Sequence, residues 1–258
     1  MASKIKIYVV DDNAGYTECL KQSLIALGYD VNRGICCGEE VIAEVGKLKP
    51  DLILVDITLG GSAYGIDAAE KIHVNFDIPV IYLAAYDDEN NFQRVKQTDP
   101  CAYLLKPFYA NQLYHTIEIA LHKHTVEEYL KEKEHRYRSI FEATGGATVV
   151  VAEDSVISIV NEEFEKLSGY SKVELQNKKF WGEFFVGEDL KRMKVFQSMR
   201  RMNPDSTLRH YGTNFVNRSG KTKNICLSIK MIPGTRESVI SMIDINEYKQ
   251  AVEGSSKN

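Results

Sequence analysis

A run of four apolar residues, Leu52 to Val55, leads directly into Asp56 and constrains the fold more than any other stretch of the chain. A short, continuous apolar run is typical of a strand in a parallel sheet that is covered on both faces. Asp56 is then expected at the carboxyl end of that strand, the edge where α/β sheets bind their ligands. The run therefore predicts a carboxylate placed for binding or chemistry.

Two other predicted strands deliver charge to the same edge: one ends in Asp11 and Asp12, and another ends in Lys106. Clustered carboxylates repel one another unless a cation joins them, and Mg²⁺ prefers oxygen ligands of this kind. A metal-held carboxylate beside an ammonium is suited to receiving a phosphoryl group, because the transferred charge is neutralised from two sides. Asp56 would be the nucleophile. Taken singly, Asp11 is equally well explained as a helix cap and Lys106 as a solvated surface lysine.

Apolar strands alternate with amphipathic helices through the first half of the chain. Strands are expected at 5–10, 29–36, 52–56, 78–83 and 101–105, and helices at 14–27, 39–47, 66–74, 87–97 and from 111 onward. This alternation predicts an α/β fold, a doubly wound five-stranded parallel sheet with right-handed crossovers.

With these motifs in place, residues 1–122 resemble the receiver domain of two-component response regulators, a flavodoxin-like fold. The resemblance is carried by the stretches 9–13, 50–56, 65–70, 78–83 and 105–108. It implies that Asp56 accepts a phosphoryl group from the phosphohistidine of a sensor histidine kinase. It also implies that Asp11 and Asp12 hold Mg²⁺ together with Asp56 and the backbone carbonyl of Thr58. Lys106 would contact the phosphoryl oxygens, and the bond from Lys106 to Pro107 would be cis.

One position departs from the receiver pattern. Receivers usually carry Thr or Ser at the end of the fourth strand, where the hydroxyl binds the phosphoryl group and draws an aromatic side chain inward; this chain has Ala84. A methyl group cannot donate a hydrogen bond, so one charge-assisted bond worth ~1.5–3 kcal/mol is missing from the phosphorylated state. Tyr103 holds the aromatic position. We therefore expect weak or unconventional coupling between phosphorylation and the face formed by the last helices and strand.

A long helix without Gly or Pro is predicted to follow, with residues 123–139 as a linker that continues the last receiver helix. Ile119, Val126, Lys133 and Ile140 recur every seven residues, with Leu130 and Tyr137 at partner positions. This weak heptad pattern is compatible with pairing to a second copy and with a single solvated helix.

Residues 140–248 predict an α+β domain with an antiparallel sheet. Strands are expected at 147–152, 156–160, 208–217, 222–231 and 238–243, and helices at 161–167 and 188–202. This order resembles a PAS domain, and the carrying residues lie at 137–142, 161–170, 217–221 and 244–246. The resemblance implies ligand binding, dimerisation or signal relay. The ligand is unknown: His210 as a haem ligand competes with a structural role, and Trp181, Phe180, Phe184 and Phe185 are expected in the core.

Net charge differs between the two halves. Residues 1–122 contain 10 Lys and Arg against 17 Asp and Glu, a balance of −7, whereas the remainder carries +3. Nine basic residues lie between 190 and 223 against Asp205 alone: Lys191, Arg192, Lys194, Arg200, Arg201, Arg209, Arg218, Lys221 and Lys223. Such a patch fits DNA phosphates or an acidic protein, and no DNA-reading motif accompanies it.

No apolar run of membrane-spanning length and no leader is present, so a cytoplasmic protein is expected. The five cysteines show no metal-ligand spacing and are expected to be reduced and mostly buried. The tail at 249–258 is expected to be disordered and fits both a natural end and a truncated chain.

The sequence is therefore interpreted as a non-enzymatic response regulator that passes its signal through the PAS domain by protein contact. A homodimer through the linker helix or the PAS domain and an unidentified downstream protein are the expected partners. Two alternatives remain: a transcription regulator that touches DNA through the basic patch, and a docking protein that works without phosphate.

Overall fold

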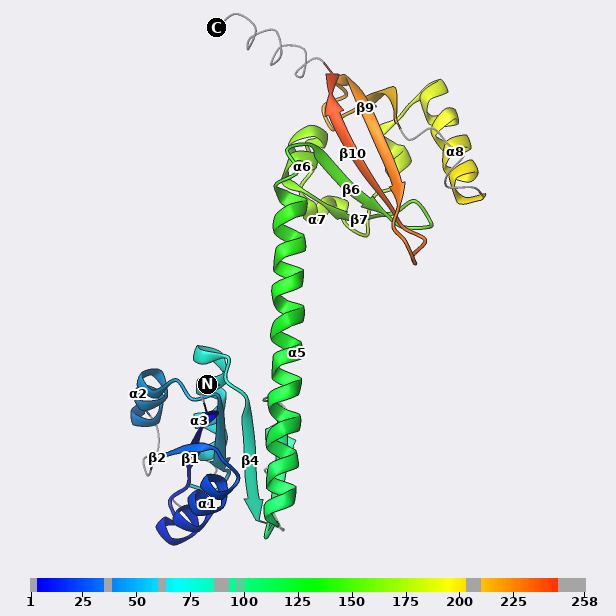
Figure 1. Ribbon diagram of the computed structural model, residues 1–258. Helices are drawn as coiled ribbons and strands as arrows, with labels where there is room; N and C mark the ends of the chain where they lie inside the picture. Colours follow the sequence, from blue (N-terminus) through cyan, green and yellow to red (C-terminus); the bar gives the residue numbers. More distant parts are fainter. Residues whose placement is uncertain are drawn as a thin grey trace, which may run out of the picture. The chain divides into compact units, whose positions relative to one another are not determined.

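The computed structural model describes residues 4–34, 39–59, 64–85, 93–96, 98, 100–202 and 210–245. The chain divides into two compact units, Met1–Glu132 and Lys133–Asn258. Each unit is built around a five-stranded sheet of its own (Figure 1).

The first sheet has the order β2-β1-β3-β4-β5, and all of its strand pairs are parallel. Its strands are β1 Lys6–Val10, β2 Asp30–Gly34, β3 Leu52–Asp56, β4 Val80–Ala85 and β5 Ala102–Lys106. Every residue from Leu52 to Val55 is fully buried, because helices cover both faces of the sheet. The predicted doubly wound parallel sheet is confirmed.

Four helices of this unit lie within the described residues: α1 Ala14–Ala26, α2 Glu39–Leu48, α3 Tyr64–Phe76 and α5 Ala110–Glu142. Leu24 of α1 and Ile117 of α5 belong to the apolar cluster on one face of the sheet. Val45 of α2 and Ile72 of α3 belong to the cluster on the other face. Of the helix expected at 87–97, residues 93–96 are helical, and residues 87–92 and 97 lie outside the described residues.

Local sequence explains where α1 begins and ends. The side chain of Asn13 accepts a hydrogen bond from the backbone N–H of Tyr16, as an N-cap does. Gly28 follows the helix with a φ of 97°, a left-handed conformation that glycine adopts without steric cost. Because the helix is capped at Asn13, Asp11 lies in the short turn between β1 and α1.

The second sheet is antiparallel and has the order β7-β6-β10-β9-β8. Its strands are β6 Ala147–Val151, β7 Ile157–Val160, β8 His210–Val216, β9 Thr222–Met231 and β10 Ser238–Asp244. The helical segments between them are α6 Glu162–Ser168, α7 Lys172–Leu175, η1 Trp181–Phe184 and α8 Gly187–Met202. The predicted antiparallel domain is confirmed.

An aromatic cluster fills the core of this second unit. Phe184 stacks on Phe215 with ring centroids 5.0 Å apart, and Phe164 and Trp181 pack around them. Such aromatic pairs add to the stability that burial alone supplies. The expectation that Phe180 joins this core is wrong, because its side chain is half exposed at the start of η1.

Two further expectations about the chain need comment. Cys19 is exposed and Cys101 and Cys226 are partly exposed, so the prediction that most cysteines are buried is wrong for these three; Cys36 and Cys37 lie outside the described residues. Within the described part of the chain, no helix combines the length and the apolar character needed to cross a bilayer.

Candidate functional site

Three charged side chains meet at the carboxyl edge of the parallel sheet. Asp11 directly follows β1, Asp56 ends β3 and Lys106 ends β5. The sheet order places β1 beside β3, so Asp11 and Asp56 are neighbours, whereas Lys106 extends past the end of β4 to reach them. β4 itself ends in Ala84 and Ala85.

Lys106 joins the two carboxylates. Its Nζ donates a hydrogen bond of 2.6 Å to Oδ2 of Asp56 and one of 2.9 Å to Oδ2 of Asp11. The side chains are largely shielded from solvent, with exposed fractions of 19% for Lys106, 14% for Asp56 and 0% for Asp11. Charge-assisted bonds in such a shielded place are stronger than those on an open surface.

The remaining carboxylate oxygens accept backbone hydrogen bonds. Oδ1 of Asp11 accepts from the N–H of Asn13 at 2.8 Å, and Oδ1 of Asp56 accepts from the N–H of Thr58 at 3.1 Å. These bonds fix both side chains against the turns that follow β1 and β3. Asp56 keeps the partial exposure that a nucleophile needs to meet a donor from solvent.

Burial raises the pKa of Asp56 above its ordinary value. Lys106 and the N–H of Thr58 act in the opposite direction, and the nearby charge of Asp11 adds to the rise. A desolvated carboxylate is a stronger base and a better nucleophile than a fully hydrated one, so this environment suits attack on an electrophilic phosphorus.

The oxygen donors expected for Mg²⁺ are only partly assembled. Asp11 and Asp56 lie together, and Thr58 is exposed beside them. Among the described residues, no three acidic, histidine or cysteine side chains are grouped closely enough to hold a metal, and the side chain of Asp12 is exposed. The donor chemistry still fits a hard cation, because carboxylate and carbonyl oxygens are the ligands that Mg²⁺ takes.

Two residues that the sequence did not single out as functional support the site. The ring of Tyr16 lies over Nζ of Lys106 at 4.1 Å, a cation–π contact, and burial followed by the charges of Asp11 and Asp56 raises the pKa of its phenol. Gly65 approaches the backbone of Asp56 so closely that a Cβ there would overlap its carbonyl oxygen. Gly65 stood in the receiver-like motif, but nothing in its spacing revealed this contact.

Ala84 and Tyr103 lie on the neighbouring strands β4 and β5. Ala84 is buried, with 1% of its surface exposed, and presents only a methyl group at the end of β4. Tyr103 is partly buried and packs against the apolar cluster that contains Ala84. The peptide bond between Lys106 and Pro107 is cis.

In the second unit, the side chain of Asn161 holds the end of α5 to the sheet. Asn161 is fully buried, and its amide nitrogen donates to the carbonyls of Phe141 and Gly146 at 3.2 and 2.9 Å. Its Oδ1 accepts from the N–H of Thr148 at 2.8 Å and from the N–H of Phe164 at 3.0 Å. One side chain therefore connects α5, β6 and α6.

Comparisons with known proteins assign both units. A family model described as the response regulator receiver domain matches residues 7–118, and one described as the PAS fold matches residues 135–233. The chain joins a receiver domain to a PAS domain. The PAS match spans β6 to β9 of the antiparallel unit, and the receiver match covers the charged sheet edge.

Curated relatives match through the receiver domain. The transcriptional regulatory protein PdtaR of Mycobacterium tuberculosis is 28% identical over 116 residues, which are 45% of this chain and 56% of the relative. The DNA-binding response regulator MtrA of the same species is 30% identical over 122 residues, 47% of this chain and 53% of the relative. The chain thus spans about half the length of these relatives, and its receiver homologues are response regulators.

Among solved structures, the signal receiver domain of a modulated diguanylate cyclase from Desulfovibrio desulfuricans G20 is 34% identical. The match covers 48% of this chain and 99% of that chain, with a TM-score of 0.46.

In the receiver domain, α5 is attached to the body beyond its buried first turns. Nζ of Lys131 lies 2.9 and 3.1 Å from the two carboxylate oxygens of Asp77. The hydrogen bond from Lys131 lowers the pKa of Asp77. The pair therefore ties α5 to the turn that precedes β4.

Further along, α5 exposes a row of large apolar side chains. Ile119, Val126, Leu130, Tyr137 and Ile140 each expose between 43% and 68% of their surface. These are the residues of the heptad pattern, so the pattern marks an exposed stripe of the helix.

The basic patch of the PAS domain is partly neutralised by its own acids. Lys191 pairs with Glu188, Arg192 with Asp189, Arg218 with Glu174 and Lys223 with Asp244, all at 2.7 to 3.2 Å. Arg209 and the side chains of Arg200 and Arg201 lie outside the described part. Each of these pairs is neutral as a whole, so the net positive charge of the patch is smaller than its basic residues alone suggest.

The PAS core offers little room for a large cofactor. A cavity lined by Trp181, Met193, Tyr211 and Ile229 has a volume of about 20 Å³, which accommodates about one water molecule. His210 is exposed at the start of the edge strand β8, not in this cavity. The structural interpretation of His210 therefore suits its position better than haem ligation.

Proposed function

We propose that this protein is a phosphoacceptor of a two-component system, in which a sensor histidine kinase phosphorylates Asp56. The observation that supports the proposal is the shielded contact between Asp56 and Lys106 beside Asp11. In-line transfer forms a bond between a carboxylate oxygen of Asp56 and phosphorus and breaks the bond from phosphorus to the donor nitrogen. Lys106 neutralises the charge on the transferred group, and the chain acts as substrate of the kinase rather than as an enzyme.

Mg²⁺ is proposed to be held by Asp11, Asp12, Asp56 and the carbonyl oxygen of Thr58. When bound, the ion would supply further charge neutralisation at the phosphoryl oxygens.

Intact mass after incubation with a small-molecule phosphodonor and Mg²⁺, with Asp56→Asn as control, tests the proposal. One added phosphoryl group that disappears in the control supports it. No addition to the folded protein would contradict it and would favour the alternative that Ala84 allows, a docking surface that works without phosphate.

The signal is proposed to leave through the PAS domain by protein contact, from a dimer paired along α5. The seam runs through Ile119, Lys123, Val126, Leu130, Lys133, Tyr137 and Ile140, which alternate at spacings of four and three. Glu127 and Glu134 flank this seam. In an antiparallel pair, these like-charged residues would face each other across the seam. In a parallel pair, Glu127 would lie opposite His122 of the second copy and Glu134 opposite Tyr129. The pattern therefore favours a parallel dimer.

DNA contact through the basic patch is less favoured, because several of its cations are paired with acids within the domain. The names of PdtaR and MtrA describe proteins that the chain matches only in part.

A further inference from the structure

A second cavity of the PAS domain lies where the sheet meets α6. It has a volume of about 470 Å³, within the range of about 300–1,000 Å³ that small-molecule sites occupy. Gly145 and Gly146 border it on one side and the end of β10 on another. A Cβ at Gly146 would lie 3.2 Å from the carbonyl oxygen of Met242, a tight contact, so glycine lets the two backbone segments lie close together.

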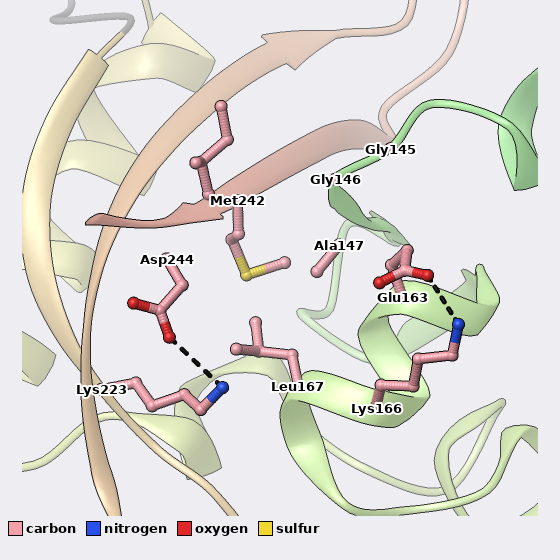
Figure 2. A pocket seen from close by; sticks show the side chains of 10 residues that line it. Gly145, Gly146, Ala147, Glu163, Lys166, Leu167, Lys223, Met242 and Asp244 are labelled. Atoms are coloured by element: carbon pink, nitrogen blue, oxygen red, sulfur yellow. Dashed lines mark hydrogen bonds and ion pairs between the residues drawn. The ribbon is translucent and has the colours of Figure 1, made fainter. Parts of the chain in front are cut away.

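The floor of the cavity is apolar and its rim is charged. Figure 2 shows the side chains of Ala147, Leu167 and Met242 between two ion pairs. These three side chains are only 1 to 7% exposed, whereas Ile243, which also lines the cavity, is 51% exposed. Ile243 is therefore the apolar surface that the cavity offers to the body of a ligand.

The two ion pairs differ in how firmly they are held. Nζ of Lys223 lies 3.2 Å from Oδ2 of Asp244, and these side chains are only 21% and 9% exposed. On α6, Nζ of Lys166 lies 2.7 Å from Oε1 of Glu163, with side chains 65% and 40% exposed (Figure 2). An exposed pair of this kind contributes little to stability, so Lys166 and Glu163 separate readily to receive a ligand.

We propose that this cavity binds a small zwitterion with an apolar body, of which a free aliphatic or aromatic amino acid is the simplest form. The carboxylate of the ligand replaces Glu163 as the partner of Lys166, and its ammonium takes up the carboxylate of Glu163. The rim carries equal numbers of cations and anions, so a purely anionic or purely cationic ligand meets a like charge. The apolar side chain of the ligand lies against Ile243.

Binding here bears on the linker helix. The carboxylate of Glu142, in the last turn of α5, accepts from the N–H of Glu162 at 2.9 Å and pairs with Lys172 at 2.7 Å. Glu162 precedes Glu163 on α6, and Gly145 and Gly146 follow α5 along the chain. A ligand in this cavity therefore contacts segments joined directly to the end of α5. This inference goes beyond the proposed phosphotransfer and does not require Asp56 to be modified.

The test is calorimetric titration of the full-length chain with L-leucine, L-phenylalanine and the dipeptide Leu-Leu. N-acetyl-leucine, which lacks the ammonium, and leucine amide, which lacks the carboxylate, serve as ligand controls. We expect saturable binding of at least one zwitterion, weakened about tenfold or more by loss of either charge. Binding of the acetylated compound as tightly as leucine would overturn the proposal.

Matched variants locate the site. Lys166→Gln and Glu163→Gln are each expected to weaken binding about tenfold. Lys191→Gln, which breaks a similar exposed pair with Glu188 at 2.7 Å on α8, should leave binding unchanged. Absence of binding heat with every zwitterion would overturn the assignment. Equal affinity in Lys166→Gln and the unaltered chain would also overturn it. Far-ultraviolet circular dichroism confirms that each variant is folded. Both outcomes are independent of phosphorylation measured by mass.

Discussion

The ammonium of Lys106 lies 2.6 Å from Oδ2 of Asp56, although β4 separates the strands that carry them. The same nitrogen contacts Asp11, so one cation serves two carboxylates that would otherwise repel each other. Lys106 thus joins the two carboxylates at this edge of the receiver sheet.

Replacing Lys106 with Gln should slow phosphorylation of Asp56 by a small-molecule donor. The charged bond is worth ~1.5–3 kcal/mol, which corresponds to about 10- to 100-fold in rate. Intact mass followed over time measures the rate. Lys71→Gln, on the exposed side of α3, is the control, and an equal rate in both variants would contradict the role of Lys106.

Gly65→Ala should destabilise the receiver domain by ~1–3 kcal/mol, because the new methyl group overlaps the carbonyl oxygen of Asp56. Thermal unfolding measures the loss. Gly15→Ala is the matched control: its Cβ meets only Asn13 Oδ1 at 3.6 Å, so this helical substitution should be neutral or stabilising by up to ~1 kcal/mol. Equal melting temperatures of the two variants would show that Gly65 is not sterically required.

Asp77→Asn should lower stability at neutral pH and leave it unchanged in acid. Pairing with Lys131 depresses the pKa of Asp77 in the folded chain, so the carboxylate stabilises the fold above the ordinary Asp range. That contribution disappears as the pH falls through the lowered pKa. Because the pair is exposed and worth ~0–1 kcal/mol, the melting temperature should fall by no more than about 4 °C at pH 7.

Melting curves of the unaltered chain and Asp77→Asn at a series of pH values measure this difference. Asn tolerates the positive φ of 49° at this position, so the backbone is not a confounding factor. A difference that grows as the pH falls would have the wrong sign.

Asn161→Ala should destabilise the PAS domain by ~2–4 kcal/mol, because it leaves several buried backbone groups without partners. Asn13→Ala is the comparison: Asn13 also caps a helix, but it is exposed, so its loss should cost only ~1 kcal/mol. Denaturant unfolding measures both. Similar losses at the two caps would mean that Asn161 does not connect α5 to the sheet as its contacts indicate.

Val126→Glu combined with Ile140→Glu should abolish the proposed dimer, since it replaces two apolar side chains of the seam with carboxylates that would face their copies in the partner. Sedimentation of the full-length chain measures the mass in solution. Val195→Glu is the control, because Val195 is 55% exposed and lies on α8. A monomer for the unaltered chain, or a dimer for the double variant, would contradict pairing along α5.

The sequence by itself determined the two sheets and the charged edge. The apolar run from Leu52 to Val55 and the alternation of strands and helices are local patterns, and a parallel sheet necessarily brings strand ends such as Asp11, Asp56 and Lys106 to one side. The sequence also predicted the apolar stripe on α5, because helical geometry places residues with heptad spacing on one face of a helix.

Only the tertiary structure decided which side chains touch. Tyr16 above Lys106, Gly65 against Asp56 and Asn161 between α5 and β6 are contacts between groups brought together by packing. Composition and periodicity carry no information about them, because each depends on the distance and direction between elements. The same limit explains Phe180 and Cys19, whose apolar character predicted burial while the path of the chain left them exposed.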